Sequence, residues 1–261
     1  MKKNIIKIFV LLLIFSYSAN TYAEDINKKV EDLISKLSMD NPSIERSKAA
    51  EEIINIGARA VPVLIKQLDD KSLHRGFIIA ILGAIGDPTA IPVIKKYIND
   101  EDESIRWPAI EALAKIGNNE SIGVLLNLYK NPDSDSLDVY YAAQSLRKCT
   151  KATGVSTLIK AAEDDSPTIV RGGTVRWTSN LAIEVLGNIK EKSAVPVLIK
   201  AIKKSKHQSV RGTALEALAK IDEKEAIKEL KESSKNDPSD SIRELARDDL
   251  KRIENKNKKG N

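Results

Sequence analysis

The six-residue sequence Val-Pro-Val-Leu-Ile-Lys occurs twice in this chain, at Val61–Lys66 and at Val195–Lys200. The two copies lie 134 positions apart in a chain of 261 residues, so they are either a site used twice or one element of a longer repeat. Alignment of the sequence with itself favours the repeat, because Ala80–Val93 matches Glu184–Val197 almost position for position.

The repeats have a mean length of about 33 residues. We mark each one by an anchor residue, defined as the residue after the last apolar position of the first predicted helix. The anchor residues are Gly57, Gly86, Gly117, Thr150, Lys190, Asp222 and Glu254. The steps between them are 29, 31, 33, 40, 32 and 32 residues, so one repeat is over-long.

Each repeat is predicted to form two helices. The first helix, for example residues 104–116, carries apolar residues at helical spacing and ends at Gly117, because glycine suits the left-handed conformation that terminates helices. The second helix begins at a cap such as Asp87, with Pro88 in its first turn. The repeated six-residue sequence starts a second helix, so we interpret it as a packing element. Its core-facing residues are expected to be Val61, Leu64, Ile65 and Leu68.

A single pair of such short helices cannot bury its apolar face alone, so neighbouring pairs must stack. The sequence therefore predicts an all-α fold, a right-handed α-solenoid of five to six helical hairpins. Residues 26–37 resemble a lone second helix and residues 241–253 a lone first helix, which would cover the two ends. No Ser/Gly-rich linker interrupts residues 24–254, so we predict one solenoid, followed by a basic flexible tail over residues 255–261.

The segment Ile85–Gly117 reads IGDPTAIPVIKKYINDEDESIRWPAIEALAKIG. It resembles the HEAT-like repeats of phycobilin lyases in its Gly-Asp-Pro junction, in the proline early in helix two, and in the acidic turn before Ile-Arg. The resemblance covers residues 26–254. It implies the fold and not the function, because such repeats serve many unrelated tasks.

The first 23 residues have the pattern of a secretory signal peptide. Lysines precede an uncharged apolar stretch centred on Ile8–Phe15, and Thr21-Tyr22-Ala23 supplies the small residues of a cleavage site. We expect the mature chain to begin at Glu24, to hold no integral membrane segment, and to be exported. The expected location is periplasmic or extracellular, in a bacterial cell envelope.

Charge and cysteine content limit the possible partners. The formal charge of +5 falls to +2 without residues 1–23, and residues 251–261 carry +4, so the body between them is near −2. A basic surplus confined to the ends does not support nucleic-acid binding. Cys149 is the single cysteine and stands where other repeats place isoleucine, so we expect it to be a buried small apolar residue.

Two rows of basic residues recur along the repeats. The first row opens the first helices and consists of Arg46, Arg75, Arg106, Arg211 and Arg243, with Val139 in the fourth repeat and Arg176 out of register. These arginines either bind anions or pair with acidic residues of the preceding turn, and we favour pairing. The second row follows the second helices at Lys66, Lys96, Lys160 and Lys200, with Asn127 in place of a lysine and Glu232 breaking the row at its C-terminal end. This row is either a cationic groove for an acidic protein segment or a set of solvated side chains.

The over-long repeat contains an insertion within Asp164–Asn180. Either its first helix starts early and runs about two turns too long, or Gly172-Gly173 breaks it and leaves an excursion tipped by Arg176 and Trp177. Insertions in repeats often mark a binding face, although loop variation is an equal explanation. The candidate partner-binding residues are Lys66, Lys96, Tyr97, Trp107, Lys160, Arg171, Arg176, Trp177 and Lys200.

No catalytic motif is evident. His74 precedes Arg75 and His207 precedes Gln208, so neither belongs to a His-Glu ligand pair, which argues against the di-iron hydroxylases built from HEAT repeats. We therefore predict a non-catalytic scaffold in the bacterial envelope that binds another protein or peptide, of acidic character, and needs no cofactor or metal. The alternative is an accessory lyase or isomerase that handles a tetrapyrrole chromophore. The sequence leaves the partner's identity and the oligomeric state open.

Overall fold

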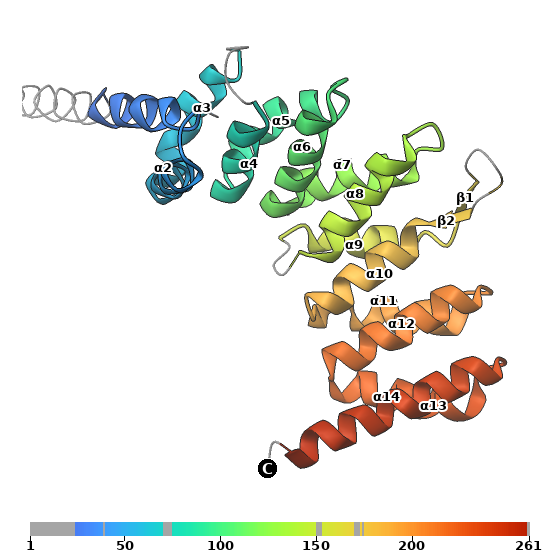
Figure 1. The fold of residues 1–261 in the computed structure, drawn as a ribbon. Coiled ribbons are helices and arrows are strands. Elements are labelled where there is room, and N and C mark those ends of the chain that lie inside the picture. Colours follow the sequence, from blue (N-terminus) through green and yellow to red (C-terminus); the bar gives the residue numbers. More distant parts are fainter. Residues whose placement is uncertain are drawn as a thin grey trace, which may run out of the picture. The chain divides into compact units, whose positions relative to one another are not determined.

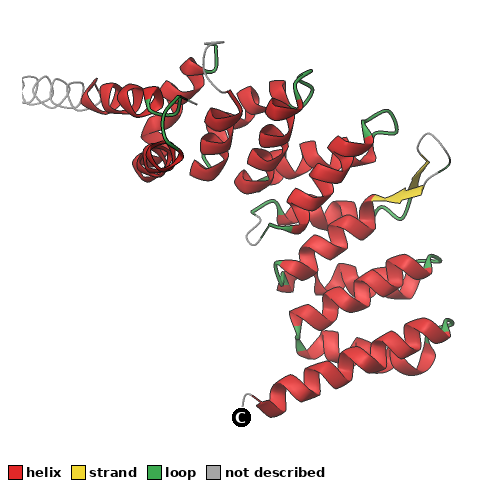
Figure 2. Ribbon diagram, viewed as in Figure 1, coloured by secondary structure: helices red, strands yellow, loops and turns green. Residues whose placement is uncertain are grey.

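The computed structural model describes residues 24–38, 40–69, 75–149, 153–169, 173 and 175–259. The predicted signal peptide and Arg171 lie outside these residues. Helices make up most of the described chain, with short loops between them and one short hairpin of two strands (Figure 2). The predicted all-α fold of stacked helical hairpins is therefore confirmed.

Residues 24–35 are helical, and the elements that follow alternate between first and second helices of the repeats. In chain order they are α2 (Ser43–Ile56), η1 (Gly57–Ala60), α3 (Val61–Gln67), α4 (Arg75–Ile85), η2 (Pro88–Ala90), α5 (Ile91–Tyr97), α6 (Glu103–Ile116), α7 (Asn119–Lys130), α8 (Ser136–Arg147), α9 (Val155–Ala162), β1 (Pro167–Ile169), β2 (Val175–Trp177), α10 (Thr178–Asn188), η3 (Lys192–Ala194), α11 (Val195–Lys204), α12 (Gln208–Ile221), α13 (Lys224–Asn236) and α14 (Asp240–Lys259).

The chain forms two compact units, residues 1–112 and residues 113–261, and the boundary falls within α6. In the first unit α4 packs against both α2 and α3 (Figure 1). In the second unit α7 packs against α8 and α9, α10 against α9 and α12, and α12 against α11, α13 and α14. No helix within the described residues is both long enough and apolar enough to cross a membrane.

The anchor residues mark a recurring backbone conformation. Gly57, Gly86, Gly117, Lys190 and Asp222 have φ angles of 70°, 76°, 62°, 55° and 58°. The prediction that Gly117 ends its helix in the left-handed region is confirmed. The same conformation occurs at the lysine and the aspartate, so the position and not the residue type defines the turn.

The repeated six-residue sequence is a packing element, as predicted. Val61, Val63 and Leu64 are buried in the first copy, and Val195, Val197 and Leu198 are buried in the second. The helix is entered through a short 3-10 turn, where Asp87 accepts a hydrogen bond from the Thr89 N–H at 2.8 Å. Lys66 and Lys200 end both copies and are exposed.

Two first helices contain Leu-Gly, at Leu82-Gly83 and Leu186-Gly187, and the first helix of the following repeat contains Glu-Ala, at Glu111-Ala112 and Glu216-Ala217. At these positions the backbones of neighbouring first helices approach closely. A Cβ added to Gly83 would lie 2.4 Å from Cα of Ala112, and one added to Gly187 would lie 2.7 Å from Cα of Ala217. Both distances are too short for real contacts between carbon atoms. Glycine therefore recurs here because only its missing side chain lets the next first helix pack against the backbone.

The arginine row fixes each first helix to the turn before it. Each arginine donates to a backbone carbonyl oxygen of that turn, which we did not predict, and Arg106, Arg211 and Arg243 also form ion pairs with the acidic side chains of Glu103, Asp237 and Asp240. The bonds run from Arg46 to Asn41 O (2.7 Å), from Arg75 to Leu68 O (3.0 Å), from Arg106 to Asp100 O (2.8 Å), from Arg211 to Ser205 O (3.2 Å) and from Arg243 to Asp237 O. Arg211 also makes a buried bidentate pair with Asp237. Carbonyl acceptors occur in every turn, so this contact needs no particular partner residue.

The over-long repeat contains an excursion and not an extended helix. β1 and β2 pair as an antiparallel hairpin, and α10 begins directly after β2. Arg176 and Trp177 lie at the base of the hairpin, whereas the excursion alternative placed them at its tip. The register shows this, because Pro167 pairs with Trp177, next to α10, and Ile169 pairs with Val175, farther from the base.

The two ends of the chain are helical. Val30, Leu33, Ile34 and Leu37 are buried on or just after the first helix. At the other end α14 continues to Lys259, through part of the segment that we predicted as a tail.

Candidate functional site

The base of the hairpin contacts the repeat before it. Arg176 Nη1 donates to the carbonyl oxygens of Tyr129 at 3.3 Å and of Asn131 at 3.5 Å. These carbonyls belong to the turn that precedes α8, whose arginine position is occupied by Val139. Arg176 therefore supplies, from the next repeat, the turn contact that the fourth repeat lacks.

The same base also contacts the repeat after it. The Trp177 ring packs on the imidazole of His207, with ring centroids 4.0 Å apart and planes inclined by 43°. His207 stands at the start of α12, and its backbone N–H donates to Ser205 Oγ at 3.1 Å. Two adjacent residues of β2 thus fasten the hairpin to the turns on either side of it.

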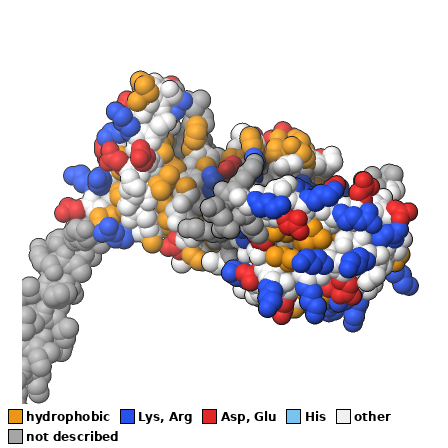
Figure 3. Space-filling view, turned by 90° about the horizontal axis from the view of Figure 1, so that it is seen from below, with side chains coloured by type: hydrophobic (Ala, Val, Ile, Leu, Met, Phe, Trp, Pro, Cys, Tyr) orange, Lys and Arg blue, Asp and Glu red, His pale blue; other side chains and the backbone are white. Residues whose placement is uncertain are grey.

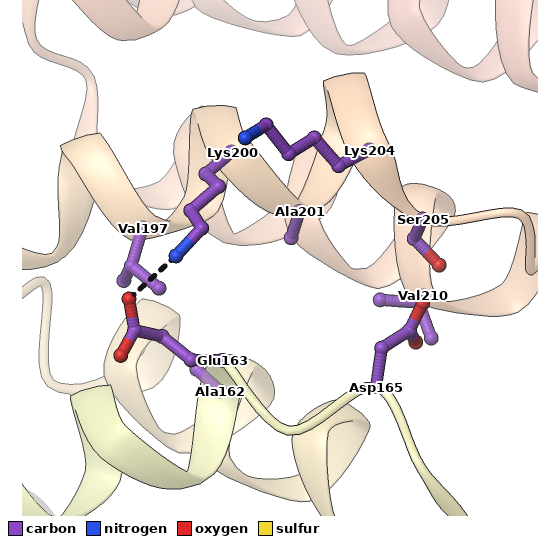
Figure 4. A pocket seen from close by; sticks show the side chains of 9 residues that line it. All are labelled: Ala162, Glu163, Asp165, Val197, Lys200, Ala201, Lys204, Ser205 and Val210. Atoms are coloured by element: carbon purple, nitrogen blue, oxygen red, sulfur yellow. Dashed lines mark hydrogen bonds and ion pairs between the residues drawn. The ribbon is translucent and has the colours of Figure 1, made fainter.

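A pocket of about 220 Å³ lies beside the hairpin, between α9, α11 and α12 (Figure 4). Its lining residues are Ala162, Glu163, Asp165, Val197, Lys200, Ala201, Lys204, Ser205 and Val210. The alanine and valine side chains form an apolar floor. Charged groups of both signs surround it, and Glu163 and Lys200 are joined by an ion pair of 2.8 Å.

The electrostatics of the pocket are set by which charges are already paired. The hydrogen bond from Lys200 and its positive charge lower the pKa of Glu163 below its usual value. The Asp165 carboxylate and the Lys204 ammonium have no ion-pair partner among the described residues. The pocket therefore offers one anionic and one cationic group to a ligand.

The predicted lysine row is partly neutralised in the second unit. Ion pairs join successive second helices, from Lys200 to Glu163 at 2.8 Å and from Lys203 to Glu229 at 3.1 Å. The hydrogen bond and charge of Glu229 raise the pKa of Lys203. A chain of such pairs describes this surface better than a continuous cationic groove.

The remaining predicted site residues are placed as follows. Lys66 and Lys96 are exposed in the first unit, on α3 and α5. Tyr97 is half-buried, with its hydroxyl 3.5 Å from the Leu68 carbonyl oxygen, and Trp107 is 48% exposed on α6. Lys160 is exposed on α9 in the second unit. The structure brings together Arg176, Trp177 and Lys200 around the hairpin and the pocket.

Four residues of this surface escaped the sequence reasoning: Glu163, Asp165, Lys204 and His207. His207 was considered only as a metal ligand, and its contact with Trp177 joins residues 30 positions apart. The over-long repeat did point to this part of the chain. No sequence signal identified which residue of the next repeat would meet the insertion.

Two further observations concern charge and metal binding. Viewed from below, lysine and arginine side chains are interspersed with acidic and apolar ones (Figure 3). Within the described residues, no group of three or more His, Cys, Asp or Glu side chains is arranged to hold a metal ion. The donor set there does not fit the two-iron centre of the hydroxylases considered above.

A family model described as HEAT repeats matches residues 61–147 and 176–251, which together are more than half of the chain. Among curated proteins, a deoxyhypusine hydroxylase of Drosophila pseudoobscura pseudoobscura is 32% identical over 97 residues. The match covers 36% of this chain, and the chain spans only 32% of that relative.

Solved structures show likeness in fold alone. The archaeal HEAT-like repeats protein from Thermococcus onnurineus NA1 has a TM-score of 0.43 at 12% identity and covers 88% of this chain and 97% of its own. Human deoxyhypusine hydroxylase in complex with glycerol has a TM-score of 0.40 at 19% identity, with the same two coverages. The phycocyanin lyase complex from Nostoc sp. PCC7120 has a TM-score of 0.37 at 22% identity and covers 72% of this chain and 75% of its own.

The prediction of a non-catalytic scaffold is contradicted by these comparisons, because the relative matched over 97 residues is an enzyme. The prediction that the chain is not an enzyme is contradicted by the same match. Both predictions rested on the lack of contiguous catalytic motifs. In a solenoid, a site can be assembled from single residues on successive repeats, and a search for local motifs does not detect such a site.

Proposed function

The chain belongs to the HEAT-repeat family, and from that premise we propose that it is the substrate-recognition part of an enzyme that acts on a protein. The surface around the β1–β2 hairpin would bind that protein. The observation that carries the proposal is the double attachment of the hairpin base, by Arg176 to one turn and by Trp177 to the next. A rigid insertion beside a pocket is a suitable site for a protein ligand.

The enzymatic part of the proposal is supported by the relative named deoxyhypusine hydroxylase, an enzyme whose name gives an amino-acid derivative as its substrate. We transfer from it the class of substrate, an amino-acid side chain, which we place in a protein, and not the hydroxylation. The described residues lack a donor set for iron, so no step of that reaction is assigned to this chain.

The size of the pocket supports a side chain as the bound group. Its volume of about 220 Å³ is below the roughly 300–1,000 Å³ of sites that hold drug-sized ligands. Its floor of alanine and valine suits aliphatic atoms, and Asp165 and Lys204 can each bind a polar end group. A tetrapyrrole would exceed this volume, so the pocket favours a protein side chain over the chromophore alternative.

The proposal is tested by capturing proteins on the immobilised full chain and measuring their intact masses. The proteins are prepared from cells with and without the gene, and a variant with Arg176→Ala and Trp177→Ala serves as the second bait. We expect a protein that is captured by the parent chain, is lost with the variant, and carries a modification absent from gene-deleted cells. Captured proteins with identical masses in both cell types would overturn the enzymatic proposal.

We also propose that the chain is exported and that the mature protein begins at Glu24. The support is the order of positive, apolar and small residues in residues 1–23. Intact mass spectrometry of the protein recovered from the envelope fraction should give the mass of residues 24–261. Recovery of protein that retains residues 1–23 would contradict this proposal.

A further inference from the structure

The hairpin carries an apolar face that the fold leaves uncovered. Cross-strand partners in an antiparallel pair point to the same side, and alternate residues point to opposite sides. The register pairs Pro167 with Trp177 and Ile169 with Val175, so these four residues share one face. Ile169 is 69% exposed and Val175 is 47% exposed. We name these four residues the hairpin face.

The opposite side of the hairpin is held in place. Arg176 and Thr168 lie there, and Arg176 is hydrogen-bonded to the Tyr129 and Asn131 carbonyls. On the hairpin face itself, Trp177 rests on His207. The face is therefore presented in a fixed orientation before any ligand arrives, which reduces the ordering entropy that binding must overcome.

The turn opposite the hairpin face is cationic. Because Trp177 contacts His207, the face is directed toward the turn that joins α11 to α12. That turn carries Lys204 and Lys206, both exposed and neither in an ion pair among the described residues. Asp165 lines the pocket and precedes β1 by two residues. It is the acidic residue nearest to the hairpin in sequence that forms no ion pair among the described residues. The local charge is net positive.

We propose that the hairpin face and the Lys204–His207 turn dock an extended, acidic segment of a protein, in which aliphatic residues alternate with aspartate or glutamate. The aliphatic residues would cover Ile169 and Val175, and the acidic residues would pair with Lys204 and Lys206. Charge complementarity selects this segment over a basic one. The inference rests on the proposed function and names the chemistry of the protein that the site receives.

The test uses the full chain and fluorescein-labelled synthetic peptides, with binding measured by fluorescence anisotropy. The probe alternates aspartate with valine, which places all valines on one face of an extended chain. One control alternates lysine with valine and the other alternates aspartate with serine. We expect the aspartate–valine peptide to bind at least about tenfold more tightly than either control, and its affinity to fall as salt is added.

Variants locate the binding surface. Ile169→Ser with Val175→Ser should weaken binding of the aspartate–valine peptide at least about tenfold, as expected when anchors of an interface are removed. The matched control is Ile44→Ser, because Ile44 is 71% exposed and lies on α2 in the other unit. Lys204→Gln with Lys206→Gln should weaken binding and flatten its dependence on salt. Circular dichroism confirms beforehand that each variant keeps its helices.

An independent signal comes from Trp177 itself. The chain contains two tryptophans, so Trp107→Phe leaves Trp177 as the single tryptophan. Its fluorescence should change when the aspartate–valine peptide binds. Equal binding by the parent and the folded hairpin variant would overturn the inference, as would equal binding of the lysine–valine peptide. Self-association that is lost in the hairpin variant would assign the face to a second copy and also overturn it. If the aspartate–valine peptide binds but no captured protein carries a modification that depends on the gene, the proposed enzymatic function is overturned and the docking inference stands.

Discussion

Lys190 and Asp222 adopt the left-handed backbone conformation that glycine adopts in other repeats. For residues with a side chain this region is strained, by about 1–2 kcal/mol, because the Cβ atom approaches the following carbonyl oxygen. Aspartate tolerates the region better than lysine, since its short polar side chain can form local hydrogen bonds. The sequence marks both residues as anchors by their place in the repeat, and the structure shows that they share the positive φ of Gly57, Gly86 and Gly117.

The strain at Lys190 predicts that Lys190→Gly stabilises the protein, by about 1 kcal/mol. The matched control is Lys148→Gly, since Lys148 caps the end of α8 with φ −83° and gains nothing from glycine. That control should lower the free energy of unfolding by about 0.5–1 kcal/mol. Urea denaturation of both variants measures the difference, and a loss of stability in Lys190→Gly would refute the argument.

Asp249 is a buried carboxyl group at the contact of α14 with the rest of the second unit. Its side chain is almost fully buried, and Oδ2 has no hydrogen-bond partner among the described residues. Burial raises the pKa of Asp249, and the negative charges of Glu216 and Asp248 raise it further, against the opposing charges of Arg252 and Lys220. The folded protein therefore favours the protonated carboxyl more than the unfolded chain does.

The raised pKa makes ionised Asp249 destabilising at neutral pH. As the pH falls through the raised folded value toward the unfolded value, the folded state takes up the proton first and this destabilisation is relieved. We expect Asp249→Asn to raise the free energy of unfolding at pH 7, with a gain that shrinks as the pH is lowered. The control Glu244→Gln, at an exposed position of α14, should show little effect. A gain that is independent of pH would disprove the role of ionisation.

At the scale of helices, the spacing of first helices is set by small residues. Gly187 on α10 faces Ala217 on α12 so closely that no side-chain atom fits between the two backbones. In the sequence this contact corresponds to Leu82-Gly83 and Leu186-Gly187, with Glu111-Ala112 and Glu216-Ala217 in the following first helices. The physical reason for the glycines is the close approach of the backbones, which only the structure shows.

This contact predicts opposite effects for the same substitution in two helices. Gly187→Ala forces α10 and α12 apart and should destabilise the protein by about 1–3 kcal/mol. Gly123→Ala lies inside α7, where the added methyl group would meet only Thr157 Cγ2 at 3.9 Å, and it should stabilise by up to about 1 kcal/mol through helix propensity. Thermal unfolding followed by circular dichroism measures the stability of both variants. Equal changes in stability would mean that helix packing does not determine the effect of a glycine-to-alanine substitution.

For the whole molecule, the features that repeat along the chain could be predicted from the sequence, and the β1–β2 hairpin, which occurs in one repeat, could not. The alternation of first and second helices and their buried faces follow from apolar spacing and from the anchor residues, because these depend on local physics that every repeat shares. The end of α14 does not, since the helix continues to Lys259 through part of the predicted tail. The hairpin was left as one of two alternatives, since its residues have no counterpart in other repeats. The contact of Trp177 with His207 and the pairing of Lys200 with Glu163 depend on how repeats stack, and a row of lysines alone does not reveal it.

Cys149 provides a probe for opening of the second unit. Its thiol is buried and donates to the Ala114 carbonyl oxygen at 3.1 Å, and burial raises its pKa to about 11. We expect the native protein at pH 8 to react with a thiol reagent only as fast as the unit opens, because reaction needs an exposed thiolate. The chain unfolded in guanidinium should react at once and completely. Immediate labelling of native protein would show that the thiol is accessible.

Arg176 contacts a turn of the repeat before its own, and this contact limits how the array can gain or lose repeats. Repeat proteins change length by duplication or deletion of whole repeats, and most repeats here contribute their own arginine to the turn before them. The fifth repeat instead supplies the arginine for the turn before α8. Its deletion would leave the Tyr129 and Asn131 carbonyls without that donor. A shortened descendant of this array would therefore lose the fifth repeat only together with a contact inside the fourth.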